Sequence, residues 1–142
     1  MRIRARINPL WEMGNILNSL SDTIKTTFNT PEGIVADFKP RVDIWEDDFF
    51  VFFEFELPGM NKEEIKITIN DDRELIVSGE KKHPTRSNKN VCYCNERKFG
   101  TFLRAFQLPE ELNLNKVQAK FENGVLTISI EKTRVSEPKE KV

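Results

Sequence analysis

Residues 117–132 read VQAKFENGVLTISIEK, and this stretch decides the fold. Apolar and polar residues alternate on both sides of Asn123-Gly124, a dipeptide that readily supplies the two positive φ angles of a type I′ turn. A period of two places every second residue on one face of a strand. The stretch therefore predicts a β-hairpin with one apolar face, formed by Val117, Ala119, Phe121, Leu126, Ile128 and Ile130.

A hairpin alone is marginally stable in water, so other strands must cover its apolar face. The same alternation predicts strands within residues 41–46, 49–56, 63–70, 74–81 and 97–109, with turn residues between them. On the run 49–56 we expect Phe49 to share a buried face with Val51, Phe53 and Phe55. Residues 112–115 should lead through a polar turn into the hairpin. Frequent turns and no helix between the strands predict an all-β fold, an antiparallel immunoglobulin-like β-sandwich.

The composition is that of one domain with a real core. The chain has 142 residues, 38% hydrophobic content and a formal net charge of −1. This balance argues against nucleic acid as a partner, because phosphate binding needs a concentrated basic field. No apolar run has the length of a secretory signal or of a membrane span. We therefore expect a cytoplasmic protein without stable membrane insertion.

Residues 1–38 form a separate N-terminal arm. Its apolar residues recur every three or four positions, which is typical of an amphipathic helix. Two interpretations stay open: a helix packed on its own domain, or an arm that offers its apolar face to other subunits or other proteins. The apolar stripe consists of Leu10, Trp11, Met13, Leu17, Leu20, Ile24 and Phe28.

A polar, basic segment at residues 81–90 predicts an exposed loop that is longer than a hairpin needs. It ends in Val91-Cys92-Tyr93-Cys94, a short strand candidate that has little core of its own to join and so suggests pairing with a second subunit. A structural disulfide between such near neighbours would be strained. With His83 the cysteines offer only three soft ligands at irregular spacing. We expect two reduced, semi-buried thiols and no metal.

No group of residues predicts an enzyme. The one histidine lies in a polar loop, no motif places a nucleophile beside a base, and the isolated glycines form no phosphate-binding loop. We therefore expect no cofactor and no small-molecule substrate, and we expect the function to lie in surfaces that bind other chains.

One charged residue stands at an unusual position in the predicted strands. Arg104 shares a strand face with Phe102 and Phe106, so it either reaches the edge of the sheet or is held by a carboxylate at a subunit interface.

Several motifs, taken in order, resemble the small heat-shock proteins, whose shared unit is the alpha-crystallin domain. They are KPRVDIWEDD, FEFELPGMNKEEIKI, ELIVSGEK, ERKFGTFLRAFQLPEEL and FENGVLTISIEK, from about Pro40 to Lys132. LPG, the E-R-x-x-G-x-F-x-R-x-F-x-L-P stretch and NGVL stand at the family's spacing. The resemblance implies an arm at 1–38, an alpha-crystallin domain at 39–133 and a C-terminal tail at 134–142.

The resemblance also implies an ATP-independent holdase chaperone of the stress response, which binds partly unfolded client proteins and prevents their aggregation. Its unit would be a homodimer that exchanges the strand Val91, Cys92, Tyr93, Cys94 between subunits, with Arg104 near the contact, and dimers would build larger oligomers. An edge groove would accept apolar tail residues, although the same side chains also suit a plain core. The groove would be lined by Ile65, Ile67, Ile69, Val117, Ala119 and Phe121.

The tail departs from the family, which usually carries I-x-I or I-x-V there. Val135 and Glu137 stand at that spacing in TRVSEPKEKV, so the apolar plug is absent. Either the chain was shortened after Val142 or assembly relies on the arm, and we expect dimers or small, unstable assemblies. The alternative functions are a CS-type co-chaperone module, which fits the strand count but not the motifs, and a carbohydrate-binding sandwich that would present Trp45 and its neighbouring phenylalanines.

Overall fold

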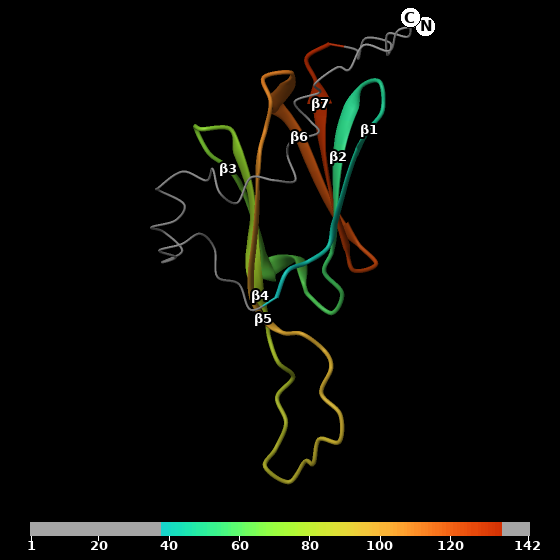
Figure 1. The fold of residues 1–142 in the computed structure, drawn as a ribbon, viewed down its shortest axis with the longest axis vertical. Helices are drawn as coiled ribbons and strands as arrows, with labels where there is room; N and C mark the ends of the chain where they lie inside the picture. Colours follow the sequence, from blue (N-terminus) through green and yellow to red (C-terminus); the bar gives the residue numbers. More distant parts are fainter. Residues whose placement is uncertain (1–37, 135–142) are drawn as a thin grey trace, which may run out of the picture.

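The computed structural model describes residues 38–134, which form two antiparallel sheets that face each other (Figure 1). One sheet has the strand order β1-β2-β7-β6, and the other has the order β3-β4-β5. The predicted antiparallel β-sandwich is confirmed. Its strands are β1 (Val42–Glu46), β2 (Phe50–Glu56), β3 (Ile65–Ile69), β4 (Glu74–Lys81), β5 (Gly100–Gln107), β6 (Leu112–Glu122) and β7 (Val125–Lys132).

The core between the sheets is rich in aromatic rings. Val51, Phe53 and Phe55 of β2 are fully buried, and they alternate with residues on the outer face of the strand. The ring of Phe106 in β5 lies 5.4 Å from the ring of Phe53 and 5.9 Å from that of Phe55. Each fully buried phenylalanine stabilises the fold by about 1.5–3 kcal/mol relative to exposure. These rings therefore hold the two sheets together.

β6 and β7 form the predicted hairpin. Asn123 has φ of 56° and Gly124 has φ of 77°, as a two-residue type I′ turn requires. The N–H of Leu57 donates to the carbonyl of Gly124 at 2.7 Å, which fastens the turn to the end of β2. A Cβ on Gly124 would lie 3.1 Å from the Cα of Pro58, so the two turns pack backbone to backbone.

A short 3-10 helix, η2 (Lys62–Glu64), lies directly before β3. The N–H of Asn61 donates to Oε1 of Glu64 at 2.8 Å, and this bond closes the helical turn. η2 packs tightly on β4. A Cβ added to Gly79 would clash with the backbone carbonyl oxygen of Glu64 and would lie 3.0 Å from Cε1 of Phe102. Only glycine fits at this crossing.

Two local predictions are wrong. Residues 112–115 form no turn, because β6 begins at Leu112 and pairs it with Lys132, with an irregular register between Leu112 and Val117. Leu112 is almost fully buried, and this burial favours the strand over the turn. Phe49 does not share the buried face of β2: it is 57% exposed, because it precedes the strand in a turn closed by the carboxylate of Asp47.

Candidate functional site

Two edge strands carry apolar side chains that the sandwich covers only in part. β3 ends the three-stranded sheet and β6 ends the four-stranded sheet. On β3 the residues Ile65, Ile67 and Ile69 are half-buried and alternate with exposed Lys66 and Thr68. A core strand would bury such isoleucines fully, so this edge is open to another apolar segment.

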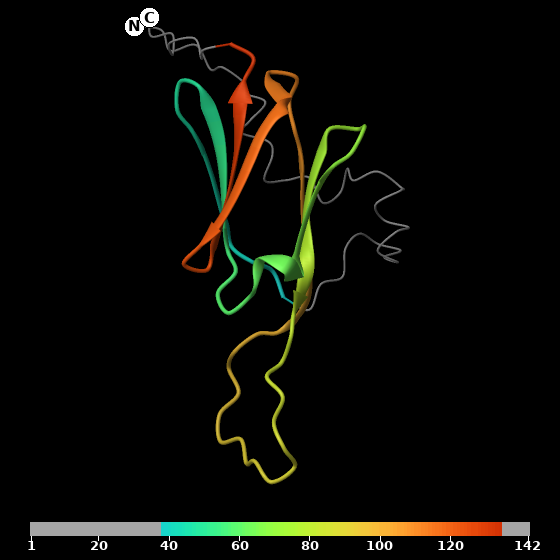
Figure 2. The same ribbon diagram turned by 180° about the vertical axis from the view of Figure 1, so that it is seen from behind.

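β3 and β6 lie on the same side of the sandwich. The opposite side is fixed by the segment that enters β1, because the N–H of Phe38 donates to the carbonyl of Thr101 in β5 at 3.4 Å, and the Phe38 ring lies 5.3 Å from the ring of Phe102. The ends of the two sheets that remain are β6 and β3, whose ribbons lie next to each other in Figure 2.

The structure brings most of the predicted groove residues together against one core. Five of the six pack on it while they remain partly exposed: Ile65, Ile67, Ile69, Val117 and Phe121. Ala119 lies between the last two on β6 and is exposed. Sequence analysis missed Leu114, which also packs on the core, because an expected turn was placed over it. Whether the surface accepts a tail stays a prediction.

The segment between β4 and β5, residues 82–99, extends away from the sandwich (Figure 1). Val91 is 70% exposed and Tyr93 is 94% exposed. In the described chain residues 91–94 form no strand, and the backbone bends at Tyr93. Cys92 and Cys94 are free and exposed, so the expectation of semi-buried thiols is wrong: no part of the sandwich reaches the tip of the loop.

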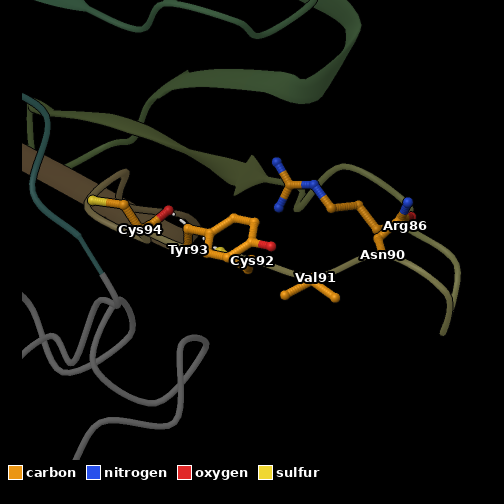
Figure 3. Close-up of a pocket in the computed structure, with 6 residues that line it drawn as sticks. All are labelled: Arg86, Asn90, Val91, Cys92, Tyr93 and Cys94. Carbon is orange, nitrogen blue, oxygen red and sulfur yellow. Dashed lines mark hydrogen bonds between the residues drawn. The ribbon is translucent and has the colours of Figure 1, made fainter.

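The tip of the loop is built around a compact turn. The N–H of Asn90 donates to the carbonyl of Ser87 at 3.0 Å, and the N–H of Ser87 donates to Oδ1 of Asn90 at 2.7 Å. Residues on both sides of this turn enclose an open hollow on the loop (Figure 3). The hollow is lined by Arg86, Asn90, Val91, Cys92, Tyr93 and Cys94.

The base of the loop is held by cations over one aromatic ring. Nζ of Lys81 lies 5.6 Å from the ring centre of Phe99, and the guanidinium of Arg97 lies 4.8 Å from it. The ring of His83 lies 4.2 Å from the same ring. Partial burial, and to a lesser degree the nearby charge of Arg97, lowers the pKa of the Lys81 ammonium. The base of the loop is thus fixed while its tip is exposed.

Arg104 lies inside the sandwich and is only 8% exposed. Its Nη1 donates to the carbonyl oxygen of Pro40 at 2.7 Å, and its guanidinium lies 5.2 Å from the ring centre of Phe106. Burial, together with the charge of Arg41, lowers the pKa of the Arg104 guanidinium. This bond goes to a backbone carbonyl rather than to a carboxylate, and it joins β5 to the segment that leads into β1.

β1 is the other end of the four-stranded sheet, so one of its edges has no partner strand in the described chain. Trp45 is 46% exposed on the outer face, where its ring stacks on Phe52 at 4.1 Å between centres. Its Nε1 donates to Oε1 of Glu54. This stacking covers one face of the Trp45 ring.

Within residues 38–134 no group of three or more histidine, cysteine or acidic side chains is arranged to hold a metal ion. No helix in this part of the chain has the length and hydropathy to cross a membrane. The arm residues and the tail with Val135 lie outside the described residues. The predictions made for them therefore have no structural counterpart here.

A protein family, several proteins and a solved structure are similar to this chain. Residues 43–142 match the model of the Hsp20/alpha crystallin family. The 17.5 kDa class I heat shock protein of Glycine max is 41% identical over 115 residues, which are 78% of this chain and 75% of that protein. The 16.9 kDa class I heat shock protein 1 of Triticum aestivum is 33% identical over 138 residues, covering 89% of this chain and 91% of that protein. The structure of heat shock protein 16.0 from Schizosaccharomyces pombe superposes with a TM-score of 0.67 at 29% identity, over 74% of this chain and 96% of that one.

Proposed function

Because this chain belongs to the Hsp20/alpha-crystallin family of small heat-shock proteins, we propose that it is an ATP-independent holdase, a chaperone that binds partly unfolded proteins and prevents their aggregation. The observation that carries the proposal is the pair of open edges: β3 and β6 both present partly exposed apolar side chains at the ends of their sheets. The family match does not favour the CS-type co-chaperone alternative.

Client binding needs no sequence-specific contacts. An unfolding protein exposes apolar surface, and covering that surface yields about 25 cal/mol per Å². The arm at residues 1–38 carries a stripe of large apolar residues that suits this task. The surrounding charged residues, 32% of the chain, keep a chaperone–client complex soluble.

We propose that the working unit is a dimer formed by strand exchange. The exposed side chains of Val91 and Tyr93 support this, because apolar residues on a long loop gain burial only by leaving their own chain. The free edge of β1 supplies backbone groups for such a strand. Arg104 would support the strand exchange from inside the sandwich, because its hydrogen bond to the carbonyl of Pro40 positions the segment that leads into β1.

The edge between β3 and β6 is proposed as the groove for apolar tail or client segments. A peptide that carries Ile-Xaa-Ile should bind the full chain, and Ile67→Lys should abolish this binding. Thr68→Lys is the matched control, because it adds the same charge to the next residue of β3, which faces solvent. Equal losses for both variants would contradict a groove on the inner face of β3.

The holdase activity is tested by heating an unrelated, aggregation-prone protein with the full chain and without nucleotide, while light scattering is recorded. We expect scattering to fall as chaperone is added, and we expect ATP to change nothing. Undiminished scattering at molar excess would refute the holdase proposal.

Assembly is tested in parallel by measuring the mass of the chain with and without Ile-Xaa-Ile appended after Val142. We expect dimers or small assemblies for the chain as it stands and larger particles after the addition. Val91→Asp should shift dimers to monomers. Asn90→Asp adds the same charge to the same loop but keeps the oxygen that accepts from the N–H of Ser87, so this variant should stay dimeric.

We propose a cytoplasmic location, which the free cysteines support.

A further inference from the structure

Cys92 and Cys94 lie on one short segment whose backbone shape decides how close their sulfurs come. In an extended strand the chain rises about 3.3 Å per residue, and side chains two positions apart point the same way. Their Cβ atoms are then roughly 6.6 Å apart, whereas a disulfide requires a Cβ separation of about 3.5–4.5 Å. A disulfide between these cysteines and an extended strand are therefore mutually exclusive.

The described chain has the bent shape. The backbone bends at Tyr93, and the thiol of Cys92 donates to the carbonyl oxygen of Cys94 at 3.3 Å, as the dashed line in Figure 3 marks. This contact turns the sulfur of Cys92 back toward the residue that carries the second thiol. Both cysteines are exposed and free, so an oxidant in solution reaches them.

We propose that Cys92 and Cys94 form a reversible intrachain disulfide that switches the loop between an exchange-competent strand and a closed, bent form. The proposal rests on the strand-exchanged dimer proposed above. Reduced, the segment from Val91 to Cys94 extends along the edge of β1 in a second subunit. Oxidised, it stays bent and loses the backbone hydrogen bonds of that pairing.

The chemistry needs a two-electron oxidant of the peroxide class. The thiolate of Cys92 attacks one peroxide oxygen, the O–O bond breaks, and a sulfenic acid and one molecule of water or alcohol form. The thiol sulfur of Cys94 then attacks the sulfenic sulfur, which forms the S–S bond and releases water. Two electrons and two protons leave the dithiol in total. A strained, exposed disulfide of this kind is readily reduced again by thiols, so the switch is reversible.

The exposed surroundings support a labile bond rather than a structural one. No part of the sandwich covers the tip of the loop, and Tyr93 between the two cysteines is almost fully exposed. Closing the ring therefore disturbs no buried contact in the described chain. The disulfide therefore weakens the strand pairing with a second subunit and leaves the stability of the sandwich unchanged.

The test treats the full chain with hydrogen peroxide and then records the intact mass, a peptide map and the native mass. We expect the loss of two hydrogen atoms per chain, a bond between Cys92 and Cys94, and a rise of at least about tenfold in the dimer dissociation constant, because several backbone hydrogen bonds are lost. Dithiothreitol should restore the dimer. The variant with both Cys92→Ser and Cys94→Ser should stay dimeric after the same treatment.

Three results would overturn the proposal. They are disulfides only between chains, oxidation only to sulfinic acid, and an intrachain disulfide in dimers of unchanged stability. A reduced chain that is already monomeric would instead count against the strand-exchanged dimer. In that case the peptide map still decides whether the disulfide forms.

Discussion

Replacing Gly79 with alanine should destabilise the sandwich by about 1–3 kcal/mol, the usual cost of an overpacked core site. The new Cβ would clash with the backbone carbonyl oxygen of Glu64, and it would lie 3.0 Å from Cε1 and 3.1 Å from Cζ of Phe102, where ordinary contact begins at 3.4 Å. A backbone oxygen cannot rotate away as a flexible side chain can. η2 must therefore move away from β4, and Ile65 at the start of β3 moves with it.

Thermal unfolding measures this cost. In a domain of about 100 residues, 1 kcal/mol shifts Tm by about 4–8 °C, so a fall of roughly 5–20 °C is expected for Gly79→Ala. Glu80→Ala is the matched control, because Glu80 is exposed on the next position of β4 and its replacement should cost less than about 0.5 kcal/mol. A Gly79→Ala chain that melts within about 2 °C of the control would refute the packing argument. A folded Gly79→Ala chain should also bind an Ile-Xaa-Ile peptide more weakly.

Three further predictions concern other parts of the sandwich. Arg104→Met keeps a long apolar stem but leaves the carbonyl of Pro40 unpaired, so the free energy of unfolding in urea should fall by about 1–3 kcal/mol, and an unchanged midpoint would count against the bond. Asn123→Val forces a β-branched residue to a φ of 56° and should cost about 1–2 kcal/mol, whereas Asn123→Gly should be nearly neutral; equal unfolding midpoints would exclude turn strain. Hydrogen bonds from the backbone N–H groups of Phe50 and then Phe49 lower the pKa of Asp47 below 3.8, so its charge stabilises the fold above about pH 4, and this contribution is lost as the pH falls through the folded-state pKa. Asp47→Asn should therefore melt below the parent chain at neutral pH and match it in strong acid, and a constant difference at all pH values would contradict this cause.

Local signals in the sequence predicted much of the sandwich. The Asn123-Gly124 dipeptide defined a turn whose two φ angles are both positive in the structure. Alternation over Phe50–Glu56 predicted which side chains of β2 are buried, because a period of two leaves no other choice once one face is apolar. The edge residues of β3 were found by the same rule, although the rule could not say that they lie at an open end of a sheet.

What the sequence did not reveal depends on contacts between distant segments. The partner of Arg104 is the carbonyl of Pro40, and any residue type offers a carbonyl, so no side-chain pattern signals this bond. Arg73 was missed for the same reason: it donates to the carbonyls of Pro109 at 2.6 Å and Leu112 at 2.8 Å, which ties the turn before β4 to the start of β6. The exposure of Cys92 likewise follows from where the loop points.

The order of the strands has a consequence for how the chain is made. Within residues 38–134, four of the five ladders join strands that follow one another in the sequence, whereas the pairing of β2 with β7 joins distant segments. Ladders of low contact order close early, whereas the distant pairing must wait. At about 5–20 residues per second on the ribosome, β7 emerges several seconds after β2, and until then Phe53 and Phe55 lack their final cover. An unfinished copy is thus itself a partly unfolded protein with exposed aromatic surface, and it belongs to the class of clients proposed above for the finished copies.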